Sequence, residues 1–342
     1  MPLIAAHQRP AIQSILCQLL TMTLEAHPIF SRRKVVFLLA SLCCLLWGSS
    51  YPAIKSGYAL FAIAPTDIAA KMVFAGYRFA FGGLVLLVMA AFSKRALFAE
   101  GVRNWRGIVV LGLTQTSIHY VFFYIGLAYT TGVKASVINS TTIFFSVWMA
   151  HLMYRNDRLT STKIVGCVIG FIGVMVVNFN HRLLDLNFTL LGEGFVVIAA
   201  FIQAAAMIYG KKISQKMNPM VMTGYQLAIG GTVLLVGGYV LGGTLGTVTA
   251  ASSALLFYLV LLSSAALSLW ALLLKYNRVG LVSVFNFQVP IFGAILSAIF
   301  LGESILEWKN IAALALVCSG IWLVTKDNSA AAPAPAQKAG GA

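Results

Sequence analysis

The chain has 342 residues, of which 60% are apolar and only 10% are charged. Soluble domains carry roughly 25% charged residues, so this composition excludes a water-soluble protein and leaves no room for a second, soluble domain. The formal net charge of +15 does not indicate nucleic-acid binding, because the Lys and Arg residues are scattered at the ends of apolar segments.

The first 34 residues stand apart from the rest of the chain. Apolar residues such as Ile12 and Leu16 recur on one side of a short segment that Pro28 closes. This pattern is typical of an interfacial amphipathic helix. An extension upstream of a natural start at Met22 explains the segment equally well. We predict a cytoplasmic N-terminal segment over residues 1–34 and leave both interpretations open.

Ten apolar segments follow, each near the roughly 20 residues that a helix needs to span a bilayer. They cover residues 35–57, 68–92, 108–128, 133–153, 164–180, 192–210, 219–241, 254–274, 280–300 and 310–325. With the N-terminus inside, most flanking Lys and Arg residues are cytoplasmic, as the positive-inside rule requires. The tail over residues 326–342 is predicted to be disordered. We therefore expect a multi-pass protein of the cytoplasmic membrane with both termini cytoplasmic.

The most informative feature is an internal repeat. Residues 129–173 align without gaps with residues 276–320, and this pairs two in-span asparagines with each other. Upstream, residues 77–83 align with residues 225–231, and this pairs Arg78 with a glutamine. The chain is therefore predicted to contain two copies of one unit.

Each copy holds five of the predicted helices. The first repeat is predicted over residues 35–180, an external linker over residues 181–191 and the second repeat over residues 192–325. Because five is odd, the second copy enters the membrane with the opposite polarity. Inverted repeats are a construction principle of secondary transporters, whose solute site lies near the midplane between the halves. The predicted fold class is an all-α integral membrane protein with ten transmembrane helices in two inverted five-helix repeats.

Three short motifs occur in order along the chain. They are Trp-Gly-Ser-Ser-Tyr at 47–51, Gly-Leu-Ala-Tyr-Thr at 126–130, and a segment from Pro290 to Glu303. Together with the duplication, they resemble EamA-type members of the drug/metabolite transporter superfamily over residues 35–325. The resemblance implies alternating access around a central cavity lined by helices 1, 3, 4, 6, 8 and 9. Members of that family carry amino acids, metabolites and drugs, so the resemblance does not choose the solute.

The two copies depart from the family pattern in three places, one of which is Ile143 in the first repeat where the second has Pro290. The first repeat has Asn156 opposite Glu303, with Asp157 as the next residue. Spacing favours Asp157 as the family acid, whereas gapless alignment favours Asn156. The second repeat has Gln203 in place of the opening Trp47. The halves are therefore expected to contribute unequally to the transport pathway.

Polar and aromatic residues inside the spans are the candidate solute-binding residues, since polar groups are costly to bury in a membrane. The set is Trp47, Ser50, Tyr51, Arg78, Gln115, His119, Asn139, Gln203, Gln226, Trp270 and Asn286. Arg78 lies near the bilayer centre, where a charge costs roughly 2.5–3.5 kcal/mol, so we expect it to meet an anionic group or to gate access. For each residue the alternative is an interhelical bond or packing.

Catalytic motifs are missing from the sequence. It has no phosphate-binding Walker loop, no H-E-x-x-H pair and no cluster of carboxylates at metal spacing. Ser49 and Ser50 lack a His positioned as base except by coincidence. We therefore predict no enzyme, no cofactor and no metal. An intramembrane enzyme stays open only as a remote alternative.

The predicted function is secondary transport of a small metabolite across the cytoplasmic membrane by alternating access, with export favoured. The solute is expected to be amino acid-like or another small organic molecule, and Arg78 favours one with an anionic group. The expected partners are this solute and the lipid bilayer, without nucleic acid. A homodimer, the energy coupling and the identity of the solute stay open. A non-transporting membrane receptor or scaffold is the main alternative.

Overall fold

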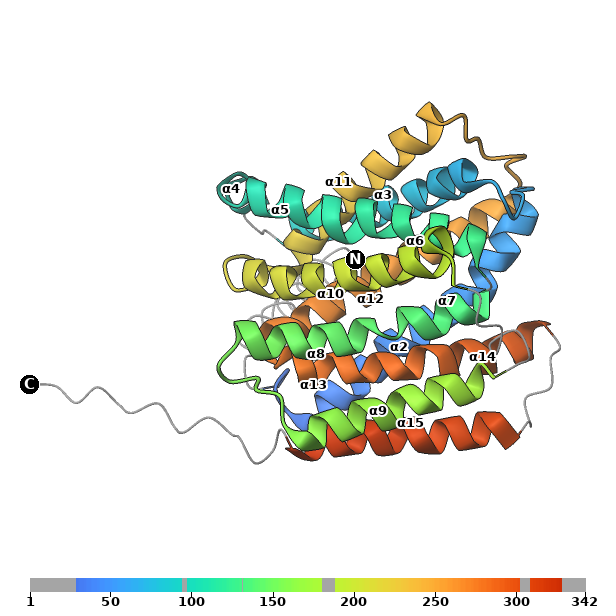
Figure 1. The fold of residues 1–342 in the computed structure, drawn as a ribbon. Helices are drawn as coiled ribbons and strands as arrows, with labels where there is room; N and C mark the ends of the chain where they lie inside the picture. Colours follow the sequence, from blue (N-terminus) through green and yellow to red (C-terminus); the bar gives the residue numbers. More distant parts are fainter. Residues whose placement is uncertain (1–28, 94–96, 131, 180–187, 302–307, 328–342) are drawn as a thin grey trace, which may run out of the picture.

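The computed structural model describes residues 29–93, 97–130, 132–179, 188–301 and 308–327, and the elements in these ranges are all helices. Six helices are long and apolar enough to cross a membrane by length and composition: Arg33–Leu60, Ile68–Phe92, Trp105–Tyr129, Leu190–Ser214, Pro219–Val240 and Ala250–Tyr276. The helices form one bundle (Figure 1). The predicted all-α membrane class is confirmed. Most of the predicted N-terminal segment and tail lies outside the described residues.

In chain order, the helices up to residue 177 are α2 (Arg33–Leu60), α3 (Ile68–Phe92), α4 (Leu97–Arg103), α5 (Trp105–Leu111), η1 (Gly112–Ile118), α6 (His119–Tyr129), α7 (Gly132–Asn139), α8 (Thr142–Met153) and α9 (Ser161–Val177). Those after it are η3 (Leu190–Gly194), α10 (Phe195–Ser214), α11 (Pro219–Val240), α12 (Ala250–Tyr276), α13 (Val279–Ser283), η4 (Val284–Phe287), α14 (Gln288–Leu301) and α15 (Trp308–Asp327). Their ends fall within a few residues of the predicted segments, and α4 was not predicted.

Several helices begin at residues whose side chains accept hydrogen bonds from the first turn. The Asp67 carboxylate accepts from the Ala70 N–H at 2.8 Å and so starts α3. Asn218 accepts from the first turn of α11, and the next residue, Pro219, fits the first helical position. Thr249 forms a reciprocal capping box at the start of α12. Local sequence signals therefore fix these starts, which hydropathy places only approximately.

Two predicted spans, 133–153 and 280–300, are interrupted rather than continuous. The first is divided into α7 and α8, with α7 ending at Asn139. The second passes from α13 through the tight 3₁₀ turn η4, which contains Asn286, into α14. These are the two asparagines that the internal repeat pairs. Interrupted helices at membrane depth occur where backbone lines a cavity or is buried in protein.

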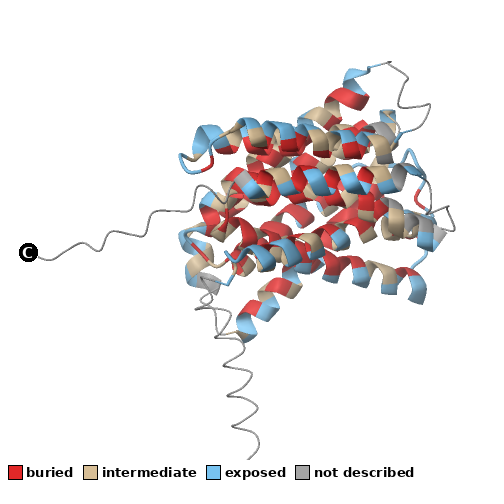
Figure 2. Ribbon diagram, turned by 90° about the horizontal axis from the view of Figure 1, so that it is seen from below, coloured by how far each residue is buried: buried red, intermediate tan, exposed pale blue. Residues whose placement is uncertain are grey.

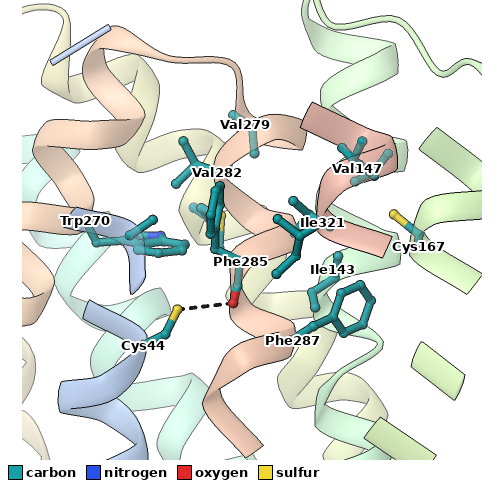
Figure 3. Packing of buried hydrophobic residues seen from close by; sticks show 14 of the residues in the cluster. Cys44, Ile143, Val147, Cys167, Trp270, Val279, Val282, Phe285, Phe287 and Ile321 are labelled. Atoms are coloured by element: carbon teal, nitrogen blue, oxygen red, sulfur yellow. Dashed lines mark hydrogen bonds between the residues drawn. The ribbon is translucent and has the colours of Figure 1, made fainter. Parts of the chain in front are cut away.

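Neighbouring side chains satisfy carbonyl groups at both interruptions. The Thr142 hydroxyl donates to the Asn139 carbonyl at 2.6 Å. The Cys44 thiol of α2 donates to the Phe285 carbonyl of η4 at 3.2 Å, as Figure 3 shows. The interruptions are therefore built into the packing of the bundle.

Two pairs of helices pack closely along their lengths, α3 with α11 and α9 with α15 (Figure 1). At the α3–α11 contact, a Cβ atom added to Gly83 would lie 2.3 Å from the Ala228 nitrogen. One added to Gly231 would lie 2.3 Å from the Ala80 nitrogen. The internal repeat pairs Gly83 with Gly231 and Ala80 with Ala228. The Gly83–Ala228 and Gly231–Ala80 contacts are therefore equivalent positions of the two repeats.

Buried residues lie mainly on the helix sides that face one another, and exposed residues lie mainly on the outside (Figure 2). Many exposed side chains are large and apolar, for example Leu38, Leu84 and Val236. An apolar exterior around a packed interior is expected when the surrounding solvent is lipid.

Candidate functional site

Arg78 is the central residue of the candidate site. It lies on α3, about 15 Å into the span at the usual rise per residue, and only 6% of it is exposed. Its Nε donates to the Ser263 hydroxyl of α12 at 2.6 Å, and its guanidinium lies 5.1 Å from the Phe79 ring centroid. Among the described side chains, Arg78 has no ion pair with a carboxylate. Its charge is therefore offset by neutral groups.

Three tyrosines supply much of this neutral environment. Tyr58 of α2 and Tyr120 and Tyr124 of α6 all lie within electrostatic range of Arg78. Phenolic oxygens stabilise a guanidinium through their lone pairs, and their O–H groups donate to a bound anion. The described groups near the Arg78 cation are thus uncharged.

The carboxylates with described side chains are engaged elsewhere. Each accepts a hydrogen bond at or beside a helix end, and none of those bonds comes from Arg78. These residues are Asp67, Glu100, Asp157 and Glu193. The site around Arg78 is therefore cationic over the described part of the chain.

An aromatic pair lies further along α12. Trp270 follows Ser263 by two helical turns, which places it on the same face about 10 Å away. Trp47 of α2 meets Trp270 edge to face, with ring centroids 4.9 Å apart and an interplanar angle of 61°. Figure 3 shows Trp270 near Cys44 and Phe285, beside the interruption at η4. The predicted residues Trp47 and Trp270 are thus brought together.

Tyr51 lies between the cationic and aromatic ends. It follows Trp47 by one turn of α2, and Tyr58 follows two turns later, so all three share one face of the helix. The Tyr51 ring lies 3.3 Å from where a Cβ of Gly293 on α14 would be, and it interacts electrostatically with Tyr120. Although flanked by α6 and α14, Tyr51 is 43% exposed. Part of the Tyr51 ring is therefore accessible.

Three other predicted residues carry buried polar atoms without a hydrogen-bond partner among the described residues. They are both ring nitrogens of His119, Oδ1 of Asn139 and Oε1 of Gln203. His119 and Gln203 face each other in the α6–α10 pair, because each lies two turns from a residue of the Gly126–Val196 contact. Unpartnered buried polar atoms call for an explanation, and a solute or water path is one.

The remaining predicted residues have structural contacts. Gln226 is buried, and its Nε2 lies 3.5 Å from the Thr116 hydroxyl across the α11–η1 contact. The Ser50 hydroxyl donates to the carbonyl of Trp47 in its own helix at 2.7 Å. Gln115 lies beside Gly210 of α10. Asn286 is half-buried in η4. None of these four contacts Arg78 directly.

Four residues of the site were missed by the sequence reasoning: Tyr58, Tyr120, Tyr124 and Ser263. Tyr58 falls on the helical face that Trp47 and Tyr51 define, and this spacing is a usable signal. Ser263 aligns with Thr116 when the repeat is extended upstream from residue 276. The two tyrosines of α6 give no such signal, because their direction depends on how that helix is rotated.

The structure also bears on the choice between Asn156 and Asp157. Asp157 is buried, pairs with Lys163 at 2.8 Å and accepts a hydrogen bond from the Gly280 N–H at 2.8 Å. Asn156 is exposed. Asp157 therefore ties the loop before α9 to the start of α13, whereas its assignment as the family acid stays a prediction. Glu303 lies outside the described residues.

Comparisons with known proteins agree with the motifs. A model of the EamA-like transporter family matches residues 34–179 and again residues 190–326. An uncharacterized transporter of Archaeoglobus fulgidus is 28% identical over 293 residues, covering 84% of this chain and 96% of that relative. The uncharacterized transporter YvbV of Bacillus subtilis is 26% identical over 304 residues, covering 86% and 92%. A crystal structure with 17% identity matches the fold with a TM-score of 0.73, covering 87% and 99%.

Proposed function

Because this chain belongs to the EamA-like transporter family, we propose that it moves a small organic solute with an anionic group across the cytoplasmic membrane by alternating access. It is a multi-pass transporter of the drug/metabolite transporter superfamily. The solute class, the site and the mechanism are the proposal. The observation that carries them is Arg78, a buried cation held by neutral groups, with no carboxylate paired to it among the described residues.

The proposed mechanism uses two inverted five-helix repeats, over residues 35–180 and 192–325. Support comes from the double match of the family model and from the equivalent contacts of Gly83 and Gly231. Groups from both halves surround Arg78, since α2, α3 and α6 belong to the first repeat and α12 to the second. Rocking of the halves about α3 and α11 would expose this site to each side in turn.

The bond between Asp157 and Gly280 joins the two halves at one end of the bundle, which we place on the cytoplasmic side. Opening toward the cytoplasm requires this end to separate. The carboxylates with described side chains lie near helix ends and are hydrogen-bonded there. We therefore propose exchange or facilitated diffusion rather than proton-driven transport, with net export set by the solute gradient.

Transport by purified protein in liposomes tests the role of Arg78. The probes are labelled pyruvate, succinate and 3-phenylpropanoate. Arg78→Gln is expected to fold, because Gln226 fits the repeat-equivalent place, but to lose at least 90% of transport. Arg78→Lys is expected to recover part of it, since an ammonium cannot make the two parallel hydrogen bonds of a guanidinium. Normal transport by Arg78→Gln, or absence of the variant from the membrane, contradicts the proposed role.

Reporter fusions test the topology. A reporter that is active only outside the cytoplasm should give a signal when inserted near residue 185 and none when inserted at Arg103. The two positions fix the parity of the first repeat, because an odd number of spans must separate opposite sides. The reverse pattern is incompatible with cytoplasmic termini and with the proposed orientation of both repeats.

A further inference from the structure

The two ends of the site differ in chemistry, and this difference points to one class of solute. Building on the proposed function, we infer that the site takes a monoanion with an aromatic body, such as an arylalkyl carboxylate, and discriminates against zwitterionic amino acids. The inference rests on the cationic end around Arg78, the absence there of a described carboxylate, and the aromatic end at Trp47 and Trp270.

The cationic end offers donors to a carboxylate. Nε of Arg78 is used by the Ser263 hydroxyl, and the terminal nitrogens donate to no acceptor among the described residues. Those nitrogens are also not among the enclosed polar atoms without a partner, so they are not fully enclosed. Two N–H groups of a guanidinium match the two oxygens of a carboxylate. Tyr58, Tyr120 and Tyr124 lie within electrostatic range of Arg78 and carry hydroxyl groups that can donate to an anion.

An α-amino group has no counterpart at this end. In an amino acid the ammonium stands on the carbon next to the carboxylate, so it would lie beside the Arg78 guanidinium when the carboxylate is bound. Like charges at that separation repel strongly in a low-dielectric interior. The described carboxylates are hydrogen-bonded at helix ends and do not offset the repulsion. Removing the amino group therefore improves the fit.

The aromatic end suits a ring at a short distance from the carboxylate. Trp270 lies about 10 Å along α12 from Ser263. Trp47 is only partly buried, so the edge-to-face pair still offers an accessible ring to a third aromatic group. Tyr51 is the exposed aromatic residue between the two ends. A two- or three-carbon chain between carboxylate and ring would let a solute contact both ends at once.

Four matched probes test the inference on the purified full-length protein: 3-phenylpropanoate, phenylalanine, phenethylamine and butanoate. The first three share one body and differ only in charge, and butanoate keeps the charge without the ring. Calorimetric titration is expected to rank 3-phenylpropanoate at least tenfold tighter than phenylalanine and butanoate, with no binding of phenethylamine. Labelled 3-phenylpropanoate should also exchange across liposomes that contain the protein.

Variants test whether the ranking of probe affinities depends on Arg78 and on the Trp47–Trp270 pair. Arg78→Gln and Arg78→Lys should each weaken 3-phenylpropanoate at least tenfold, whereas Arg106→Gln, which changes an arginine near the start of its span, should not. Trp270→Leu should remove the advantage of 3-phenylpropanoate over butanoate, whereas Trp148→Leu on the exposed side of α8 should keep it. If Arg78→Gln is absent from the membrane, the proposed role of Arg78 in transport is contradicted, and Arg78→Lys then tests whether Arg78 binds 3-phenylpropanoate.

The outcomes separate this inference from the proposed function. Phenylalanine binding as tightly as 3-phenylpropanoate, with Arg78 required for both, overturns the inference and leaves anion transport standing. Binding of 3-phenylpropanoate that is indifferent to Arg78 and Trp270 also overturns the inference. Binding with the expected ranking but without flux supports the inference and contradicts transport. Failure of all four probes to bind, with no flux of labelled carboxylates, overturns both.

Discussion

Two hydrogen bonds occupy matching places in the two halves of the molecule. Arg78 of α3 donates to Ser263 of α12 at 2.6 Å, and Gln226 of α11 approaches Thr116 of η1 at 3.5 Å. The internal repeat pairs Arg78 with Gln226 and Ser263 with Thr116. One contact is short and charge-assisted, whereas the other is neutral and at the limit of a hydrogen bond. The same packing thus holds either chemistry, and it does not require the charge.

A second pair of bonds is kept in both halves. Ser264 of α12 donates to the Gly82 carbonyl at 2.9 Å, and Ser117 of η1 donates to the Gly230 carbonyl at 3.0 Å. The repeat again pairs these residues with one another. This interhelical bond is of the same kind in both halves, whereas the bond at the candidate site is charge-assisted in one half and neutral in the other. The scaffold is therefore similar in the two halves, whereas the candidate site is specialised in one of them.

The largest effect is expected where the scaffold is tightest. Gly83→Ala and Gly231→Ala each place a Cβ atom 2.3 Å from a backbone nitrogen of the neighbouring helix, so the helices must separate. We expect each to cost roughly 3 kcal/mol or more and to abolish monodisperse protein. Gly237→Ala is the control, because its Cβ would meet only the end of Met72 at 3.4 Å. Size-exclusion profiles and thermal unfolding measure the difference. Unequal effects of Gly83→Ala and Gly231→Ala would show that the two contacts are not equivalent.

The next largest effect concerns the exchange of charge between the halves. The double variant Arg78→Gln with Gln226→Arg moves the cation to the matching place. We expect it to fold but to keep less than 10% of transport in liposomes, because the second place lacks the indole pair. In the alignment of the two repeats, Gln203 corresponds to Trp47 and Phe123 corresponds to Trp270. Transport restored to near the original rate would show that the two places are interchangeable.

A smaller difference is expected between the two hydroxyl partners. Ser263→Ala removes the acceptor of a charge-assisted bond, which is worth roughly 1.5–3 kcal/mol. We expect a rise in KM of roughly tenfold or more, together with a lower unfolding temperature, because the same bond also stabilises the fold. Thr116→Val keeps the side-chain shape and removes only the long contact to Gln226, so KM should stay within about twofold. Transport assays over a range of solute concentrations give the KM of both variants. Equal changes in KM for Ser263→Ala and Thr116→Val would contradict the proposed difference between the two halves.

Hydropathy and the repeat predicted the six long apolar helices well, because long apolar segments are fixed by the thickness of the bilayer, whereas ten membrane crossings stay a prediction. They missed the interruptions at Asn139 and Asn286, since a few unwound residues leave the mean hydropathy of a span unchanged. They also missed η1, a π-helical stretch that holds Gln115 and alters which residues share a face. Hydroxyl-rich sequence near Asn139 is a weak local hint, whereas the corresponding place near Asn286 has none.

The candidate site was predicted in part for the same reason. Arg78 could be singled out because a central charge must be offset, and Trp47 because of its motif. The tyrosines that surround Arg78 could not, since a Tyr in a span also suits the membrane interface or ordinary packing. Their role depends on the rotation of α2 and α6, which follows from contacts made far away in the sequence.

The smallest effect should come from the duplicated serines, and it should be equal in both halves. Ser117→Ala and Ser264→Ala each remove one donor to a glycine carbonyl of the facing helix. Interhelical hydrogen bonds in membrane proteins average about 0.6 kcal/mol, so each variant should lower the unfolding temperature slightly and by a similar amount. Neither should change transport by more than about twofold, because neither hydroxyl faces Arg78. Ser264 also donates to the Val260 carbonyl of its own helix at 2.8 Å, so Ser264→Ala removes a hydrogen bond within α12 as well. The variant Ser268→Ala, whose hydroxyl bonds only within α12 among the described residues, corrects for that local part. After this correction, a Ser264 effect that still differs from that of Ser117 would mean that the scaffold, and not only the site, has diverged between the halves.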